Sequence, residues 1–444
     1  MKKEQDIIFH TGKKIFAPAL NSFVLHVLND AMDRGISTLF FLARDAYLYY
    51  VIAEKYVKKF DLNIQCKYLC VSRLSLRVPL YHLDIKQALS YITLGGVDVT
   101  PTTVINRAGI PEEDKPQFVD RLAAYLKVQK DEQIPRHRLG EVSNLLKSDE
   151  DFIRVLAQHS ENEFTNALKY LDEMGFGAKE KIAVVDSGWV GSIQQSLNVF
   201  REHLGVQEPV EGYYYGLYEI PASADEQQYH SFLFGPRTGL KNKVLFNNCL
   251  FECIFSAPHG MTVRYRRESD KMVPVLSEVS QSQIDFMNQL ESIISDYMDE
   301  LFALHNSFEE ISGLINNPAS QKEIEAALFR FMSKPTRQEA EVFGQLHFSD
   351  DVIDYDNALL AAKLTEKDFD DNHFWRRVVL ELRERIFGKR HVVNISGWFE
   401  GSVMLYATQS RIKSHLWSYN HYKYYLQYSK RKRWLRERER NEKT

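Results

Sequence analysis

The segment Lys181–Gln195, KIAVVDSGWVGSIQQ, decides the fold of this chain. Residues 182–185 form a continuous apolar run, which is typical of a strand buried on both faces of a parallel sheet. Asp186 is expected to emerge at the carboxyl end of that strand, where the two following glycines predict a tight turn. A helix is expected to begin near Ser192. A strand, a glycine-rich turn and a helix in this order predict an α/β unit.

The same alternation occurs earlier in the chain. Helical periodicity is interrupted by runs of strand length, and each run is followed by polar residues. This order predicts parallel strands joined by crossover helices, with ligand-binding loops at the carboxyl ends of the strands. The expected elements are a helix at 17–34 ended by Gly35, a strand at 37–42, the loop ARDA at 43–46, a helix at 48–60, a strand at 64–71 and the loop SRLSLR at 72–77.

The rest of the chain divides into two regions. Residues 83–178 are polar and mostly helical in pattern, so we expect a helical insertion that caps the sheet. Strand patterns return at 210–218 and within 228–247, and a helix end at 250–255 leads into another strand. We therefore predict an α/β core over 1–270 and a mostly helical region over 271–444, which opens with a long helix at 281–308.

Composition places the chain among globular proteins. It has 444 residues, 44% of them hydrophobic, and a formal net charge of −4, so neither disorder nor binding to nucleic acid is expected. We find no signal-peptide pattern and no apolar run of the ~20 residues that a membrane span needs, so cytoplasmic localisation is expected. The four cysteines form two CxxxC pairs, whose spacing favours reduced, buried thiols over a zinc site.

The segment 411–440 is both basic and aromatic. One interpretation is a helix that lies on the anionic inner face of a membrane, anchored by residues such as Trp417, Tyr428 and Trp434. The other is an ordinary terminal helix with a solvated basic face. Basic charge interleaved with aromatic rings also occurs in proteins that bind single-stranded nucleic acid, but we expect no nucleic-acid partner here.

The glycine-rich segment has the chemistry of a phosphate site. Backbone N–H groups at the start of a helix are unpaired and carry partial positive charge. The segment is not a P-loop, because it lacks GKS or GKT, and its glycine spacing is not that of a Rossmann fingerprint. The alternative is a plain strand–helix corner in which Asp186 only caps the helix.

Two further loops strengthen the phosphate interpretation. Arg44-Asp45 and Ser72-Arg73, with Arg77, also follow apolar strands, and parallel strands bring such loops to one edge. Guanidinium groups bind phosphate, while a carboxylate among them would hold Mg²⁺ or sugar hydroxyls.

Three chemistries then fit: phosphoribosyl transfer, a haloacid-dehalogenase-type phosphatase, or nucleotide-sugar glycosyl transfer. The phosphatase needs a second Asp where Gly188 stands. A non-catalytic sensor of a phosphosugar or nucleotide is the remaining alternative.

Four motifs together resemble one bacterial family: FLARDAYLYYVIAEKY (41–56), YLCVSRLSL (68–76), VVDSGWVGSIQQSL (184–197) and FECIFSAPHGMTV (251–263). Members of that family are encoded in polysaccharide-biosynthesis clusters and are often fused to a haloacid-dehalogenase domain. The family looks like phosphoribosyltransferases that install ribofuranose in bacterial glycans such as O-antigen or capsule. The order of ARDA and DSGWVGS is also similar to that of type I phosphoribosyltransferases, whose parallel-sheet fold it implies.

The resemblance implies a reaction and its partners. Phosphoribosyl pyrophosphate would donate 5-phosphoribose to a glycan acceptor, expected to be lipid-linked, and a separate phosphatase would then remove the phosphate. The enzyme would be cytoplasmic or peripheral at the inner membrane face. The sequence departs from the usual patterns at Ala46, where Gly is common, at the single acidic residue Asp186, and at Trp189-Val190 in place of Thr-Gly.

Roles for individual residues follow from the resemblance together with the residue chemistry. We expect Asp186 to hold ribose hydroxyls, Asp45 or Glu252 to act as general base, and Asp45 and Asp186 to share Mg²⁺. Glu252 is equally explained as a structural helix carboxylate, and His259 is expected to lie in a surface turn. The expected substrate-binding residues are Arg44, Ser72, Arg73, Arg77, Ser187, Gly188, Trp189, Val190, Gly191, Ser192 and Gln194.

Overall fold

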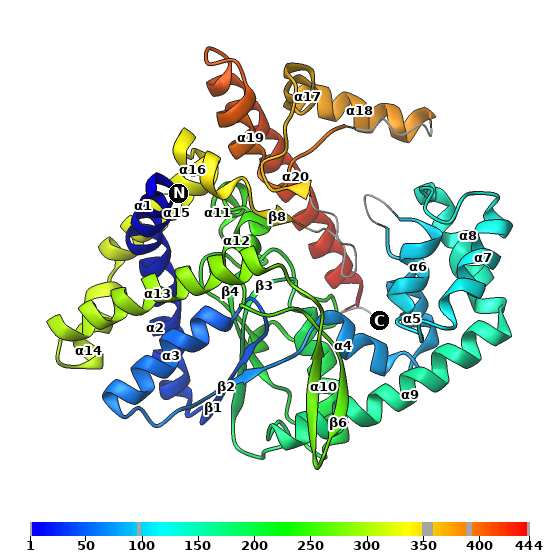
Figure 1. Ribbon diagram of the computed structural model, residues 1–444, viewed down its shortest axis with the longest axis horizontal. Coiled ribbons are helices and arrows are strands. Elements are labelled where there is room, and N and C mark those ends of the chain that lie inside the picture. Colours follow the sequence, from blue (N-terminus) through cyan, green and yellow to red (C-terminus); the bar gives the residue numbers. More distant parts are fainter. Residues whose placement is uncertain (1, 96–98, 349–357, 388–392, 442–444) are drawn as a thin grey trace.

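The computed structural model describes residues 2–95, 99–348, 358–387 and 393–441, which form a mixed α/β protein (Figure 1). Five parallel strands form the central sheet in the order β2-β1-β3-β4-β5. The sheet consists of β1 (Thr38–Leu42), β2 (Gln65–Leu69), β3 (Ile182–Trp189), β4 (Glu211–Leu217) and β5 (Tyr229–Ser231). Two antiparallel pairs lie outside it: β6 (Thr262–Glu268) with β7 (Lys271–Leu276), and β8 (His347–Phe348) with β9 (Ala358–Leu359).

Helices α2 and α3 lie within a residue of the ranges predicted for them, and Gly35 ends α2 with a φ of 69°. The N-terminal 270 residues contain further helices for which the sequence did not predict both ends. The helices of this region are α1 (Lys2–Thr11), α2 (Ala17–Arg34), α3 (Tyr47–Phe60), α4 (Arg73–Arg77), α5 (Ile85–Ile92), α6 (Pro101–Ala108), α7 (Lys115–Leu126), α8 (Leu139–Ser148), α9 (Glu150–Glu173), α10 (Ser192–His203), α11 (Leu240–Leu245) and α12 (Asn248–Ile254). A π-helical segment, η1 (Gly12–Phe16), joins α1 to α2. The 3₁₀ turns are η2 (Val78–Leu80), η3 (Arg136–Arg138) and η4 (Glu226–Gln228).

The region after residue 276 is largely helical, as predicted, apart from the short strands β8 and β9. Its helices are α13 (Gln281–Leu304), α14 (Phe308–Ile315), α15 (Pro318–Ser333), α16 (Arg337–Phe343), α17 (Glu366–Asp371), α18 (Phe374–Phe387), α19 (Phe399–Tyr406) and α20 (Ile412–Asn441).

The central sheet is buried on both faces, which explains the unbroken apolar runs of its strands. Leu39, Phe41 and Val185 pack into one hydrophobic core with α2, α3 and α13. Phe40 and Val184, which alternate with them, pack into a second core with α9 and α10. Because successive side chains of a strand point to opposite faces, a strand between two helical layers must be apolar at every position.

The helical insertion is present, but most of it does not cap the sheet. Its helices α5–α8 gather at one side of the molecule and share a separate core with the first part of α9 (Figure 1). Only α9 reaches the sheet, where Ala167, Tyr170 and Leu171 contribute to the second core. The expectation of a cap is therefore wrong for α5–α8, because these helices bury their apolar faces against one another.

The segment SRLSLR, predicted to be a loop, contains the short helix α4. Ser72 caps it: the Ser72 hydroxyl accepts the N–H of Ser75 at 3.0 Å, and the Ser75 hydroxyl accepts the N–H of Ser72 at 2.9 Å. This reciprocal capping pair satisfies two N–H groups that a helix start leaves unpaired. The sequence signal was present in Ser72-x-x-Ser75, but the helix of five residues is too short to show apolar periodicity.

Strand β3 is longer than predicted. It runs through Trp189, so Asp186 lies within the strand instead of following it, and the turn is confined to Val190 and Gly191. Pairing with β4 explains the extension, because Gly188 lies opposite Gly216. A Cβ atom on Gly188 would stand 2.5 Å from the carbonyl oxygen of Gly216, so only glycine permits this approach.

The basic C-terminal helix α20 packs on the protein along part of its length. Trp434 is 3% exposed, and its indole Nε1 donates a hydrogen bond of 2.7 Å to the carbonyl oxygen of Ile220, just after β4. Trp434 is therefore no membrane anchor in this conformation, contrary to the first interpretation of the sequence. Trp417, Tyr424 and Tyr428 are 65%, 52% and 52% exposed and stay available to a surface.

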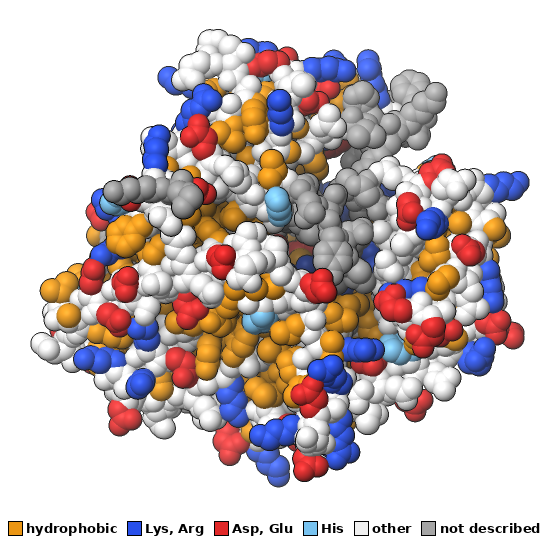
Figure 2. Space-filling view, in the orientation of Figure 1, with side chains coloured by type: hydrophobic (Ala, Val, Ile, Leu, Met, Phe, Trp, Pro, Cys, Tyr) orange, Lys and Arg blue, Asp and Glu red, His pale blue; other side chains and the backbone are white. Residues whose placement is uncertain are grey.

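Acidic and basic side chains are interspersed over the face shown in Figure 2, in keeping with the small net charge. Within the described part of the chain, none of the helices combines the length and the apolar character of a membrane span.

The two tryptophans of α20 provide a matched test of this packing. Trp434→Ala removes a buried indole and its hydrogen bond, so the free energy of unfolding should fall by about 3 kcal/mol or more. Trp417→Ala, on the exposed side of the same helix, should change it by less than about 0.5 kcal/mol. Urea unfolding followed by circular dichroism measures both; equal losses would contradict the docking of α20 through Trp434.

Candidate active site

The predicted site lies where the strand order of the sheet changes direction. Strands β1 and β3 pair as far as Phe41 and Val185, and beyond these residues β3 pairs only with β4. Arg44 and Asp45 leave β1 at this point, and Asp186 is the first residue of β3 past the last β1 pair. In open parallel sheets, such a change of direction opens a ligand-binding crevice at the carboxyl ends of the strands.

Three acidic residues from separate elements act on one another here: Asp45, Asp186 and Glu252, which we call the carboxylate cluster. Burial raises the pKa of Asp186 to about 8, and the negative charges of Asp45 and Glu252 contribute. Burial and the charge of Asp45 raise the pKa of Glu252 to about 7. Like charges in a site shielded from water oppose one another's ionisation, which adds to the effect of burial at Asp186 and Glu252.

Arginines border the carboxylate cluster without neutralising it. Burial raises the pKa of Asp45, although the positive charges of Arg44 and Arg73 oppose that rise. Arg73 also opposes the increases in pKa at Asp186 and Glu252. Arg73 is exposed to solvent, whereas Asp186 is 9% exposed. The site therefore has a buried carboxylate, Asp186, and an exposed cation, Arg73, nearer the solvent.

Helix α12 supplies Glu252, and Trp189 holds it in place. The indole Nε1 of Trp189 donates a hydrogen bond of 2.5 Å to Oε1 of Glu252. The ring packs against Phe246 and Phe251, with centroid distances of 5.1 and 5.7 Å. Trp189 has a φ of 71°, which costs a residue other than glycine roughly 1 kcal/mol or more. The surrounding packing holds this conformation, which aims the indole at Glu252.

Helix α4 places two arginines on one face. Arg73 and Arg77 are four residues apart, so their side chains project from the same side of the helix. The positive charge of Arg73 contributes, after burial, to lowering the pKa of Arg77. In the described part of the chain, no carboxylate forms an ion pair with Arg44, Arg73 or Arg77. A mostly buried guanidinium beside a second cation favours an anionic ligand.

Arg77 also contacts the start of helix α10. Its Nη2 donates to the hydroxyl of Ser192 at 3.1 Å, and its guanidinium lies 4.2 Å from the ring centroid of Tyr91. Gly191 precedes the helix with a φ of 65° and offers no side-chain cap. A Cβ atom on Gly191 would stand 2.6 Å from the Tyr229 ring, so glycine is required here. The first N–H groups of α10 and Arg77 together form a positive site of the kind predicted for a phosphate.

Other predicted site residues have structural contacts. The Ser72 hydroxyl donates to the carbonyl oxygen of Thr262 at 2.6 Å, in addition to capping α4. The Ser187 hydroxyl is buried, 3.4 Å from that of Tyr49. The Gln194 amide donates to the carbonyl oxygens of Val210 and Gln228 and accepts the hydroxyl of Tyr214. The hydrogen bonds of these side chains connect the elements that surround the site. That they also contact a substrate stays a prediction.

Three residues near the cluster were not predicted as part of it. The charges of Asp45 and Asp186 help to raise the pKa of Tyr49, after burial and Tyr215. Tyr68 donates to or accepts from His259 at 2.9 Å, and burial lowers the pKa of His259 with a contribution from Arg44. His259 lies in a bend, as predicted, and is only partly exposed there, close enough to Arg44 for the charge of Arg44 to affect its pKa. For His259, the only indication in the sequence of a place near the site was its position shortly after Phe251-Glu252.

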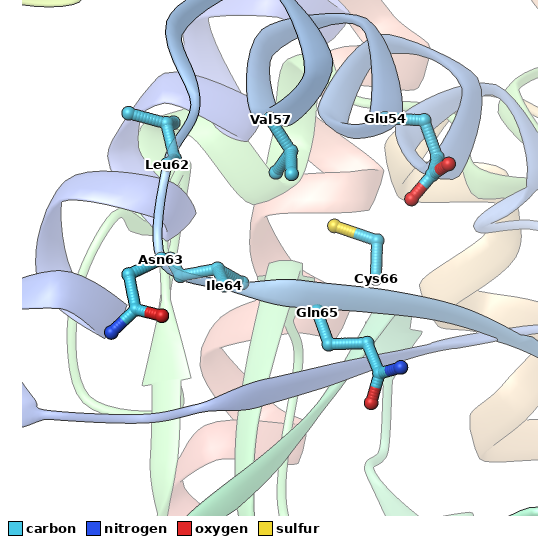
Figure 3. A pocket seen from close by; sticks show the side chains of 7 residues that line it. All are labelled: Glu54, Val57, Leu62, Asn63, Ile64, Gln65 and Cys66. Atoms are coloured by element: carbon cyan, nitrogen blue, oxygen red, sulfur yellow. The ribbon is translucent and has the colours of Figure 1, made fainter.

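A separate depression lies at the amino end of β2, whereas the candidate site lies at the carboxyl ends of the strands (Figure 3). Its lining consists of Glu54, Val57 and residues 62–66, and Glu54 is its one charged side chain. Because it has no cation for a phosphate and no second carboxylate, we do not regard it as the active site.

No model of a known protein family matches the chain, and no curated protein matches it. The function must therefore be inferred from the geometry. Carboxylate oxygens that repel one another are suitable ligands for Mg²⁺, and such an ion would relieve the repulsion within the carboxylate cluster. The arrangement can bind an anionic, oxygen-rich ligand, hold a hard cation and accept a proton near pH 7.

The raised pKa of Asp186 predicts a specific dependence of stability on pH. Its usual value is 3.8, so between about pH 4 and 8 the folded protein binds more protons than the unfolded chain. Stability due to this group is therefore complete below pH 4 and is lost as pH rises through 8. Asp186→Asn removes the loss, and its free energy of unfolding at pH 8 should exceed that of the wild type by about 1–3 kcal/mol.

The same variant should show no such gain at pH 4.5, where the wild-type carboxyl is protonated. Urea unfolding at both pH values makes the comparison, and Asp270→Asn, at a fully exposed carboxylate, is the matched control. If Asp186→Asn lowers the stability at pH 8, the cluster is a stabilising ion network and not a site under electrostatic strain.

Proposed function

We propose that this protein transfers 5-phosphoribose from phosphoribosyl pyrophosphate to a hydroxyl group of a glycan acceptor. The observation that carries the proposal is the carboxylate cluster at the change of strand direction. Arg44 and Arg73 lie nearby and form no ion pair with a carboxylate of the described residues. A phosphorylated sugar that carries a second phosphate group needs anion sites at both ends and hydroxyl-binding carboxylates between them. The resemblance of the four sequence motifs points to the same donor.

The two groups of cations suit the two ends of the donor. Arg44 and Arg73 would neutralise the pyrophosphate, while Arg77, Ser192 and the N–H groups that follow Gly191 would bind the 5-phosphate. Asp186 would then accept hydrogen bonds from the ribose hydroxyls. Asp45 and Asp186 would hold Mg²⁺, which would supply positive charge beside the pyrophosphate.

The reaction itself is a substitution at C1 of the ribose. The acceptor oxygen forms a bond to C1, the bond from C1 to the pyrophosphate oxygen breaks, and its electron pair leaves with the pyrophosphate. The proton of the acceptor hydroxyl passes to a carboxylate. Glu252 is suited to this role, because its pKa of about 7 matches a general base and Trp189 fixes its orientation. The arginines stabilise the charge that develops on the leaving group.

Binding of the donor tests the proposal first. Calorimetry with phosphoribosyl pyrophosphate and Mg²⁺ should show one site, for which ribose 5-phosphate and pyrophosphate each compete. Arg73→Gln and Arg77→Gln should weaken binding at least tenfold, since each removes a charge-assisted contact worth about 1.5 kcal/mol or more. Arg267→Gln, in the β6–β7 hairpin, is the matched control and should bind like the wild type.

Other outcomes separate the alternatives. Tight binding of a nucleotide sugar instead of phosphoribosyl pyrophosphate would favour a nucleotide-sugar glycosyltransferase. Binding of phosphoribosyl pyrophosphate without pyrophosphate release, when lipid-linked oligosaccharide is supplied, would favour a sensor. No binding of phosphoribosyl pyrophosphate to the wild type would refute the proposal.

A lipid-linked acceptor would bring the enzyme to a membrane surface, which motivates a second prediction. The exposed rings of Trp417 and Tyr428 lie on α20 together with exposed basic residues such as Lys432 and Arg433. We expect the protein to sediment with vesicles that contain anionic lipid, and to do so less as salt concentration rises. Trp417→Ala should reduce the bound fraction; salt-insensitive or absent sedimentation would exclude this surface contact.

A further inference from the structure

Three side chains with metal-binding atoms meet far along the chain from the carboxylate cluster, at the junction of α17, α18 and α20. One donor atom each from Asp370, His373 and His415 lies within 4.8 Å of the other two. The closest pair is Nε2 of His373 and Nδ1 of His415, at 2.8 Å. Oδ1 of Asp370 is 3.9 Å from Nε2 of His373.

These separations suit a tetrahedral ion. Bonds of ~2.0–2.1 Å to Zn²⁺ place neighbouring donor atoms ~3.3 Å apart, which lies between the two distances observed here. The separation of the two histidine nitrogens and that of Asp370 from His373 each differ from this value by roughly 0.5 Å. Asp370 and His373 are three residues apart, and their side chains are 46% and 25% exposed, so a water molecule has access to a fourth position.

Hydrogen bonds around the group orient its most buried member. His415 is fully buried, and its Nε2 lies 3.2 Å from Oε2 of Glu366. A proton on Nε2 satisfies that carboxylate and leaves the lone pair of Nδ1 directed toward His373. Histidine ligands of metal ions commonly donate their other ring nitrogen to a carboxylate in this way.

Arg411 contributes a positive charge to the group formed by Asp370, His373, His415 and Glu366. Its guanidinium donates to Oε2 of Glu366 at 2.9 Å and also to Asp370. One arginine against two carboxylates leaves a formal charge of −1 when both histidines are neutral, so a divalent cation is attracted overall. The arginine also holds both carboxylates in position, which reduces the ordering that binding would require.

We propose that Asp370, His373 and His415 bind a divalent transition-metal ion such as Zn²⁺, with Glu366 orienting His415. Two imidazole nitrogens and a carboxylate oxygen favour Zn²⁺ and similar ions over Mg²⁺ or Ca²⁺, which prefer oxygen alone. The ion would fasten α17 and the start of α18 to α20. This proposal does not depend on the proposed function, because the two sites have no residue in common.

Metal titration of the full chain, after treatment with a chelator, tests the site. We expect one equivalent of Zn²⁺ to bind and Co²⁺ to give the visible absorption of a tetrahedral complex. The midpoint of thermal unfolding should rise by about 2 °C or more at saturation. His373→Ala and Asp370→Asn, at partly exposed positions, should each weaken binding at least tenfold.

His421→Ala is the matched control, because His421 is an exposed histidine on the same helix as His415. This variant should bind the ion like the wild type. Absence of stoichiometric binding, or wild-type binding by His373→Ala, would overturn the proposal. Binding of phosphoribosyl pyrophosphate should be unchanged in His373→Ala, so failure of the metal site and failure of the proposed function give different results.

Discussion

Repulsion among three acidic groups, of which Asp186 is buried and Asp45 and Glu252 are partly buried, is the constraint around which the α/β half of the molecule is arranged. Asp45 follows β1, Asp186 lies in β3 and Glu252 lies in α12. The charges of Asp45 and Glu252 raise the pKa of Asp186, and the charge of Asp45 raises the pKa of Glu252. A fold does not gain stability from such an arrangement. Packing of the helical layers on both faces of the sheet must therefore offset the free energy that the repulsion costs at the carboxyl ends of the strands. Strain at a site together with ample packing elsewhere is typical of proteins in which binding or catalysis depends on that site.

Much of the fold followed from local patterns. Helix α2 and its end at Gly35 were predicted within a residue, and so were α3 and the strands β1 and β4, because apolar periodicity is strong in buried elements. The convergence of ARDA, SRLSLR and DSGWVGS also followed, since parallel strands bring their carboxyl ends to one edge. Glu252 joined them from outside the sheet, and only the FE motif had indicated it.

The errors arose where structure depends on partners distant in sequence. The extra length of β3 requires Gly216 on β4, which lies 28 residues beyond Gly188 and gives no local signal. Trp434 is buried where its indole meets the carbonyl oxygen of Ile220, which lies more than 200 residues earlier in the chain. Helix α20, whose sequence is basic, is therefore partly packed against the protein. The meeting of Asp370, His373 and His415 likewise depends on the docking of α18 against α20. Spacing alone cannot predict such contacts.

The hydroxyl of Ser72 has a consequence that extends beyond helix capping. It fixes the start of α4, which carries both Arg73 and Arg77, and it donates to the carbonyl oxygen of Thr262, ten residues after Glu252. The Ser72 oxygen therefore fixes the position of Arg73 and Arg77 relative to the segment that follows Glu252. If this site came to bind a ligand of different length, Arg73 and Arg77 could not move apart by changes within α4 alone. Because both arginines lie on α4, the distance between them stays fixed. Any adjustment to such a ligand would have to come from the loops at the strand ends.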